Sequence, residues 1–321
     1  MPLLSVRSLT VEAVGRKSRR TLVRSASFDV ARGEAVAIVG ESGSGKTLTA
    51  LSIMGLLRAP NLEVSNGEVL FNGENLRTME PAAFRLMRGD RLSMIYQDPM
   101  TSLNPLMRVG RQLTEPLTIR GVDDAIATAR AREALVRVGI PDATRALGSY
   151  PHQFSGGMRQ RIMIALALIL EPDLLVADEP TTALDVTIQQ QILALVQQEQ
   201  RARNMGLVWI THDLGVVAQL VDRVVVMYNG SIVEVAARAD IFTRPAHPYT
   251  KALIGSIPMA GDPPHKRLMG IPMAKTDAPV GGCPFAPRCP RVSAACDAMP
   301  ETVEISPGHH VACFNPETSV A

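Results

Sequence analysis

Eight consecutive residues, Gly40–Thr47 (GESGSGKT), have the composition of a loop that binds phosphate groups. They match the pattern G-x-x-x-x-G-K-[ST] and lie between a predicted buried strand and a predicted helix. The glycines let backbone N–H groups turn toward the phosphates, Lys46 supplies a positive charge, and Thr47 offers a hydroxyl to Mg²⁺. The predicted binding set is the loop without Glu41: Gly40, Ser42, Gly43, Ser44, Gly45, Lys46 and Thr47. A glycine-rich turn without a ligand is the alternative, and the flanking strand and helix argue against it.

Two adjacent acids, Asp178 and Glu179, end a second apolar stretch, DLLVADEP. Open α/β folds place their ligands at the carboxyl ends of their strands, and acids there are costly unless they are used. Asp178 would hold Mg²⁺, and Glu179 would orient or deprotonate an attacking water. The alternative is that one of them caps the following helix.

A third candidate is the segment FSGGMRQR, in which Ser155, Gly156 and Gly157 open a predicted helix. The exposed amides of a helix N-terminus form an anion site. Taken alone, Ser-Gly-Gly more often marks a flexible turn, so its weight comes from its place between the phosphate loop and the acidic pair.

With this segment the chain resembles the ATP-binding subunit of ATP-binding-cassette (ABC) transporters, whose signature sequence is similar to FSGGMRQ. Phe154 and Met158 replace the commonest leucine and glutamine of that signature. The remaining marks occur in the family's order. Gln97 in YQDP resembles the Q-loop glutamine, Asp185 in TALD the D-loop aspartate, and His212 in ITHD the switch histidine.

The resemblance implies that the chain hydrolyses ATP, with Glu179, His212 and Gln97 as catalytic residues. Gln97 would also join Thr47 and Asp178 at Mg²⁺, and Asp185 would belong to the nucleotide site. Two cassettes meet head to tail in this family, so that Ser155, Gly156 and Gly157 of one chain face the phosphate loop of the other. One chain alone is then expected to be a poor ATPase.

The family usually stacks adenine on an aromatic residue upstream of the phosphate loop, but none occurs between Glu12 and Ala26. Phe28 is predicted to be a core residue of its strand. An aliphatic side chain such as Leu22 or Val23 is the substitute that we consider, and it would weaken discrimination between bases.

Two further stretches, QDPMTSLNPLMRVG after Tyr96 and RPAHPYTKALIGSIP from Arg244, are similar to the peptide and nickel importer branch. The resemblance implies two transmembrane permeases, contacted by the loop at residues 97–105, and a second ABC ATPase, with a paralogue favoured. It also implies an extracytoplasmic substrate-binding protein and a peripheral position on the cytoplasmic face of the inner membrane. The expected cargo is a di- or oligopeptide. Nickel or another small solute, a soluble non-transport cassette ATPase, and a module that holds ATP without turnover remain alternatives.

All four cysteines, Cys283, Cys289, Cys296 and Cys313, lie near the C-terminus in a segment rich in Pro and Gly. Four thiolates can ligate a [4Fe–4S] cluster or a tetrahedral Zn²⁺, but the spacing fits neither paired zinc motifs nor the compact ferredoxin run. The tail resembles the C-terminal domain of peptide-importer ATPases, some of which carry an iron–sulfur cluster. A cluster is therefore the preferred prediction, with free or disulfide-bonded thiols and zinc as alternatives. His309 and His310 are substitute ligands in this scheme, although solvated loop histidines are favoured.

The elements that must position these residues alternate between strands and helices. Strand patterns occur at residues 4–14, 21–30, 34–40, 67–76, 173–180, 206–213 and 223–235, and helical patterns at 47–57, within 100–170, and at 187–204. Asn-Gly pairs at residues 72–73 and 229–230 predict hairpin turns. With the resemblance, this predicts a RecA-like α/β core with an antiparallel β subdomain and a helical subdomain (about 100–170). These form residues 1–235, and a loop-rich, cysteine-containing domain forms 236–321.

The composition is that of an ordinary globular protein. The chain has 321 residues, of which 46% are hydrophobic, and 33 basic against 31 acidic residues give a formal charge of +2. That balance gives no electrostatic footprint for nucleic acid. The longest apolar run, Ile162–Leu170, is far shorter than the roughly 20 residues of a transmembrane helix, and no signal peptide pattern begins the chain. A cytoplasmic protein is expected.

Overall fold

The computed structural model describes residues 1–15, 18–57, 61–98, 102–181, 184–256, 270–273 and 281–317. Within these ranges no helix combines the length and the apolar character needed to span a bilayer. The chain divides into two compact units, each built from several segments. The first contains residues 1–3, 30–34 and 78–209, and the second contains residues 4–29, 35–77 and 210–321.

An antiparallel sheet with the strand order β2-β1-β4-β5 forms part of the second unit. Its strands are β1 (Leu4–Val14), β2 (Arg19–Val30), β4 (Leu62–Phe71) and β5 (Glu74–Asn75). The β4–β5 turn has positive φ at both Asn72 (49°) and Gly73 (86°), as a two-residue type I′ hairpin requires. The predicted hairpin is therefore confirmed.

The second unit also contains five strands of a mixed sheet, in the order β11-β12-β10-β9-β3. They are β3 (Ala35–Val39), β9 (Arg223–Tyr228), β10 (Ser231–Ala237), β11 (Val303–Ser306) and β12 (His309–Val311). β3 and β9 are parallel, whereas β9, β10, β12 and β11 pair antiparallel. Since β3 is buried at every residue, this sheet gives the loop that follows it a rigid base.

Where the structure describes the second unit, its α-helices are α1 (Lys46–Ile53), α9 (Leu214–Leu220), α10 (Arg238–Thr243) and α11 (Pro248–Gly255). The sequence predicted the first of them, four residues too long, and missed the others. The prolines after Glu234 suggested only loops, but Pro248 occupies the first turn of α11, where the missing N–H costs nothing. The C-terminal part is therefore more regular than expected.

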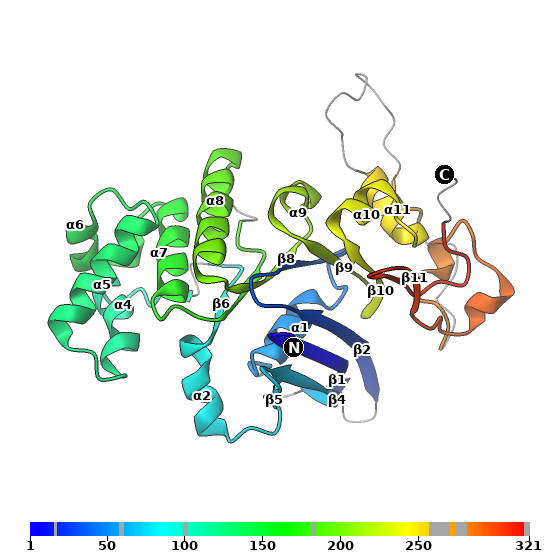
Figure 1. Cartoon of the computed structure of the whole chain (residues 1–321), viewed down its shortest axis with the longest axis horizontal. Helices are drawn as coiled ribbons and strands as arrows, with labels where there is room; N and C mark the ends of the chain where they lie inside the picture. The colour runs from blue at the N-terminus through cyan, green and yellow to red at the C-terminus, as the bar shows by residue number, and fades with distance from the viewer. Residues whose placement is uncertain are drawn as a thin grey trace. The chain divides into compact units, whose positions relative to one another are not determined.

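The first unit places the strands β8, β7 and β6, of which β7 and β6 are parallel, beside a group of helices. Its strand order is β8-β7-β6, with β6 at Leu92–Ile95, β7 at Leu174–Asp178 and β8 at Gly206–Thr211, the last two residues of β8 being counted with the second unit. Its helices are α2 (Pro81–Asp90), α4 (Val109–Thr118), α5 (Asp124–Arg137), α6 (Ala143–Gly148), α7 (Gly156–Leu168) and α8 (Val186–Arg203). The helices α4 to α7, green in Figure 1, confirm the predicted helical region. α2 and β6 were not predicted.

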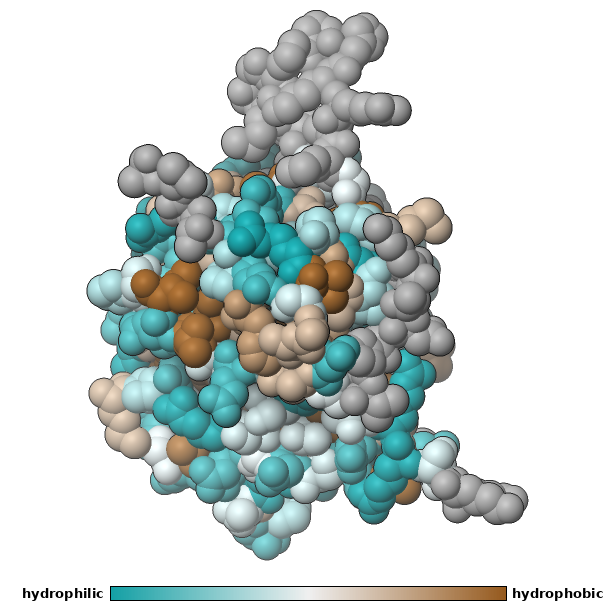
Figure 2. All heavy atoms as spheres, turned by 90° about the vertical axis from the view of Figure 1, so that its right-hand side faces the viewer, coloured by the Kyte–Doolittle hydropathy of each residue, from teal (hydrophilic) through white to brown (hydrophobic). Residues whose placement is uncertain are grey.

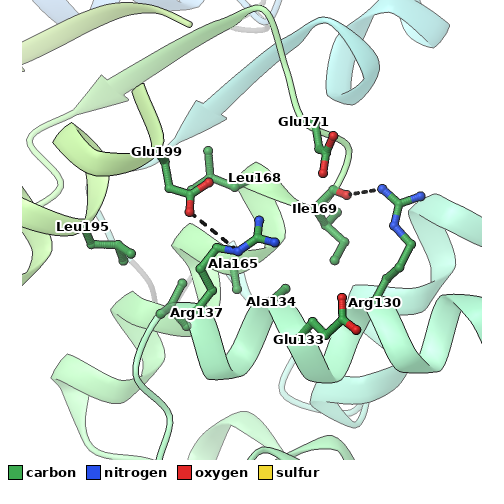
Figure 3. A pocket seen from close by; sticks show the side chains of 11 residues that line it. Arg130, Glu133, Ala134, Arg137, Ala165, Leu168, Ile169, Glu171, Leu195 and Glu199 are labelled. Atoms are coloured by element: carbon green, nitrogen blue, oxygen red, sulfur yellow. Dashed lines mark hydrogen bonds and ion pairs between the residues drawn. The ribbon is translucent and has the colours of Figure 1, made fainter. Parts of the chain in front are cut away.

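Between α5, α7 and α8 lies a hollow of about 60 Å³, far smaller than the roughly 300–1,000 Å³ of ligand pockets (Figure 3). Charged side chains line it, and several of them are engaged with one another or with the backbone. Arg137 Nε lies 3.6 Å from Glu199 Oε1, and Arg130 donates to the carbonyl oxygen of Ile169 at 3.2 Å. The hollow is a packing gap of the helical region.

Candidate nucleotide site

The phosphate loop joins β3 to α1 within the second unit, as predicted. Gly45 has φ 99°, and a Cβ atom there would lie 3.1 Å from Val23 Cγ2 and 3.2 Å from the carbonyl oxygen of Leu22. Only glycine combines this conformation with so close an approach. The loop is thus packed against β2, which holds the beginning of α1 in place.

Lys46 lies across the loop with only 5% of its surface exposed. Its ammonium donates to the carbonyl oxygens of Gly40 (2.8 Å) and Glu41 (3.0 Å). The buried hydroxyl of Ser44 has no hydrogen-bond partner within the described residues, and no side chain caps the N-terminus of α1. A buried cation, an unpartnered hydroxyl and uncapped helix amides together fit an anion such as a polyphosphate.

The two candidates for adenine contact differ in exposure. Val23 is fully buried and packs against Gly45, whereas Leu22 retains some exposed surface. Leu22 is therefore the better placed of the two to touch a base, and this assignment stays a prediction.

The acidic pair ends β7 in the first unit. Asp178 is 3% exposed, and Glu179 adopts the left-handed conformation at φ 45°. Such strain in a residue other than glycine persists only where the surroundings enforce it, and it is common at functional sites. Gln97, just beyond β6, donates from Nε2 to Glu179 Oε2 at 3.2 Å. Parallel strands have thus brought the predicted glutamine and glutamate together.

The alternative role of these acids as helix caps is wrong. α8 is capped instead by Asp185, whose Oδ1 accepts from the backbone N–H of Ile188 at 2.9 Å. The D-loop aspartate therefore has a structural role on its own chain. Its neighbours Thr182 and Ala183 lie outside the described residues.

Ser155 caps α7, since its hydroxyl accepts from the backbone N–H of Met158 at 3.4 Å. A Cβ atom at Gly157 would approach Ile188 of α8 to 3.2 Å, whereas one at Gly156 would meet nothing within 4 Å. Gln160 is 1% exposed and donates to the carbonyl oxygen of Pro180 at 2.5 Å, so that α7 is bonded to the turn after Glu179. The buried Gln160 was not predicted as a functional residue, although a polar residue in an apolar helix is a usable signal.

His212 follows β8 in the second unit and is exposed. The next residue, Asp213, caps α9 by accepting from the backbone N–H of Gly215 at 2.8 Å. The histidine is therefore held at the junction between a buried strand and a capped helix. Its switch role stays a prediction.

The four cysteines are free thiols; Cys283 and Cys296 are buried, and Cys289 and Cys313 half-buried. Their backbones meet where Cys283 N–H donates to the carbonyl oxygen of Cys296 at 2.9 Å. Burial raises the pKa of Cys283 and Cys289, and that of Cys313 to about 11, and neighbouring thiols add to each rise. Across the described residues, no three or more His, Cys, Asp or Glu side chains are arranged to hold a metal ion.

The expectation that His309 is a solvated loop residue is wrong. It lies in β12 with 1% of its surface exposed, and its Nε2 is 2.7 Å from Glu234 Oε1. Glu234 of β10 also accepts from the backbone N–H groups of Ala246 (2.7 Å) and His247 (2.8 Å). His309 thus forms a hydrogen bond with the buried carboxylate of Glu234. Glu234 was not among the residues predicted from the sequence. His310 is half-buried in the same strand.

Comparison with known proteins covers both halves of the chain. Residues 23–182 match the family model described as ABC transporter, and residues 233–296 match "Oligopeptide/dipeptide transporter, C-terminal region". A dipeptide transport ATP-binding protein of Bacillus subtilis is 49% identical over 97% of this chain and 94% of its own length. An oligopeptide transport ATP-binding protein of Salmonella typhimurium is 43% identical over 98% and 94%.

Among solved structures, the ATP-binding cassette MJ0796 bound to ADP and Pi, a dimer in a post-hydrolysis state, is similar with a TM-score of 0.65. The two share 26% identity, and the match covers 73% of this chain and 98% of the cassette. The fold is therefore that of an ABC ATPase, as predicted. On this likeness, and on near-full-length identity to transporter ATP-binding proteins, the chain belongs to the ABC transporter ATPase family, in the branch with the oligopeptide/dipeptide C-terminal region.

Proposed function

We propose that this chain is the ATP-hydrolysing subunit of an importer and drives di- or oligopeptides through partner permeases. The main support is a sequence identity of 43–49% with peptide, dipeptide and oligopeptide transport ATP-binding proteins over 97–98% of the chain. The C-terminal region that marks this branch begins within β10, a strand of the sheet that positions the phosphate loop, and it includes α10 and α11. The division at Val235 is proposed as a functional boundary, although β10 runs across it.

The phosphate loop would bind ATP through its backbone N–H groups, with the charge of Lys46 on the β- and γ-phosphates. The Thr47 hydroxyl and the Asp178 carboxylate would hold Mg²⁺, with Gln97 as a further oxygen ligand, because hard cations prefer such donors. The metal would neutralise phosphate charge. Glu179 would orient the attacking water and accept its proton, and His212 would contact the γ-phosphate.

A second cassette would complete the site. The open space around Gly156 and the N-terminal amides of α7 supply a surface on which the phosphates of ATP bound by another chain could lie. Ser155 and Gly157 would then face the opposite phosphate loop. We propose a paralogue as that partner.

Contact with a permease is proposed for the segment after Gln97, of which residues 99–101 lie outside the described part. Leu106, in this segment, is 86% exposed. The loop that presents it is ordered, because Asn104 accepts from the backbone N–H of Leu106 at 3.0 Å and exchanges hydrogen bonds with Gln112. An apolar side chain on an ordered loop is suited to docking on an apolar partner. The chain would then lie at the cytoplasmic face of the inner membrane.

For the cysteine segment, residues 281–317, we propose a [4Fe–4S] cluster ligated by Cys283, Cys289, Cys296 and Cys313. The support is the donor chemistry: four free thiols, with backbone N–H groups of Phe285, Arg291 and Asn315 directed at three of the sulfurs. The arrangement as it stands is not a preformed ion site. Because the thiols of Cys283, Cys289 and Cys313 have raised pKa values, their ligation would release protons. Anaerobic purification with iron and acid-labile sulfide analysis tests this. About four iron and four sulfide per chain would support the cluster. The absence of both iron and sulfide would contradict it.

Transport is tested by reconstituting the chain with its permeases, its paralogous ATPase and its binding protein in vesicles. We expect ATP-dependent uptake of labelled dipeptides, lost when the complex carries Glu179→Gln. Uptake of nickel without uptake of peptides would show that the cargo is nickel, and the role as an importer ATPase would stand. ATP hydrolysis by the isolated chain that permeases neither bind nor stimulate would instead favour a soluble ATPase.

A further inference from the structure

Glu41, the one residue of the phosphate loop that the nucleotide assignment leaves without a role, is engaged at every polar group. Its backbone N–H donates to Tyr249 Oη at 2.9 Å, and its carbonyl oxygen accepts from Lys46 Nζ at 3.0 Å. Its carboxylate receives both terminal nitrogens of Arg288, Nη1 on Oε2 at 2.8 Å and Nη2 on Oε1 at 3.1 Å. All these residues belong to the second unit.

Arg288 itself is held from several sides. Its Nε donates to the carbonyl oxygen of Pro272 at 2.6 Å, and Nη1 also reaches Tyr228 Oη at 3.3 Å. Its guanidinium carbon lies 5.8 Å from the centre of the Tyr228 ring. The side chain is 19% exposed. An ordinary surface ion pair contributes little, but a bidentate pair with an immobilised, largely covered arginine is among the stronger kinds.

An aromatic cluster fixes the backbone that carries this arginine. Phe285, fully buried, packs against Tyr228, Tyr249 and His247, with ring centroids 5.1, 5.5 and 5.7 Å away. The short 3₁₀ turn Ala286–Arg288 follows at once and ends at Cys289. The cysteine segment thus presents Arg288 to the phosphate loop from a rigid support.

We propose that Arg288 is a positioning residue for nucleotide binding, which acts on the phosphate loop through Glu41. It holds Glu41 from the side chain while Tyr249 holds it from the backbone, so the two carbonyls that contact Lys46 keep their places. It also neutralises a carboxylate that would otherwise repel the phosphates of ATP. This inference rests on the proposed nucleotide binding at Gly40–Thr47.

The test measures the Kd of the full chain for a fluorescent ATP analogue. Arg288→Ala is expected to raise the Kd about tenfold, within the usual range of coupling between sites. Arg291→Ala is the matched control, because Arg291 lies in the same segment but pairs with Glu317 at 3.3 Å. It should leave the Kd unchanged. An unaltered Kd in Arg288→Ala, or an equal rise in both variants, overturns the proposal.

A double-mutant cycle separates positioning from general loosening of the fold. Glu41→Gln combined with Arg288→Ala should bind no more weakly than Arg288→Ala alone, because the two side chains act as a pair. Arg288→Lys, which keeps the charge without the fork, should bind between wild type and Arg288→Ala. If the rise in Kd of the double variant equals the product of the rises in the two single variants, the proposal is overturned. In the assembled transporter, KM for ATP should rise while kcat stays within twofold.

Nucleotide binding by the wild-type chain separates a failure of the proposed function from a failure of the positioning role alone. A wild-type chain that fails to bind the nucleotide analogue overturns the proposed function and, with it, this inference. A wild-type chain that binds, with an Arg288→Ala variant that binds equally well, overturns the positioning role alone. Thermal unfolding of each variant shows whether the chain is folded when the Kd is measured.

Discussion

The phosphate loop and the cysteine segment, residues 281–317, belong to the same compact unit but are organised differently. The loop is eight consecutive residues between a buried strand and a helix; short-range bonds of Lys46 order it from within, and Tyr249 and Arg288 hold it at Glu41. The cysteine segment gathers thiols spread from Cys283 to Cys313. It is held by 3₁₀ turns, by the pairing of β12 with both β11 and β10, and by an aromatic cluster.

This difference decides what each region can tolerate. In the phosphate loop, the atoms proposed to bind nucleotide belong to consecutive residues. Single substitutions there should therefore affect nucleotide binding and hydrolysis more than stability. In the cysteine segment, long-range contacts carry the fold, so changes there should affect stability first. Changes at Glu179, in the nucleotide site, and at Glu234, His247 and Cys289, which lie in the cysteine segment or contact it, test that division.

Glu179→Gln should lower ATP turnover of the assembled complex by about 10²–10⁴-fold, because the water loses its base. ATP binding should remain, and the closed pair of cassettes should accumulate. Turnover and retained nucleotide are measured on the same sample. Gln97→Asn, which withdraws the partner of Glu179 Oε2, is a second probe. Turnover at the wild-type rate in Glu179→Gln would refute the base assignment.

Glu234→Ala should destabilise the second unit by about 3–4 kcal/mol, because two backbone N–H groups and His309 lose their buried acceptor. Chemical denaturation measures the loss. Glu234→Gln keeps one of the two acceptor oxygens and should cost about half as much. If both variants unfold like wild type, long-range contacts do not carry this region.

Acid should weaken the same region through His247, whose pKa burial lowers to about 4. The unfolded chain binds this proton near pH 6.5, so stability present above pH 6.5 is lost as the pH falls to 4. The total is about 3 kcal/mol. Unfolding free energies at pH 7, 5.5 and 4.5 follow this loss. His247→Gln should flatten the profile between these values, and a profile unchanged by the substitution would place the acid sensitivity elsewhere.

Cys289→Ser should change the unfolding free energy of the metal-free chain by less than about 1 kcal/mol, since the thiol is half-buried and of similar size to the hydroxyl. Denaturation is compared with and without a chelator under anaerobic conditions. A much larger loss without chelator, abolished by it, would show that a bound metal group carries the stability of this segment. The stability of the segment would then depend on the metal group more than on its long-range contacts.

Much of the fold could be predicted, because the strands and helices that position the phosphate loop have strong periodicity. β1 was predicted at its observed bounds, and both Asn-Gly hairpins formed. α2 escaped notice because Arg88 and Gly89 interrupt its helical conformation, and β6 because four residues are too few for a pattern. α10 and α11 were hidden by prolines taken as breakers.

Prediction of the site stopped where sequence separation becomes large. The pattern named Lys46 and Glu179 because motifs fix them locally. Nothing local marks Arg288, which reaches Glu41 across 247 residues, or Glu234, which reaches His309 across 75. Such pairs depend on the sheet order, which brings β12 beside β10, and a single sequence does not contain that order.

The pairing of β10 with β12 has a consequence for synthesis on the ribosome. β10 is complete long before β12 emerges, and during that interval its outer edge lacks its native strand and Glu234 lacks the imidazole of His309. An unpaired strand edge in a nascent chain invites association with other chains. We therefore expect that C-terminal truncations before residue 309 would be caught by chaperones or proteases as unfinished molecules (Figure 2 shows the face on which this last part of the chain lies).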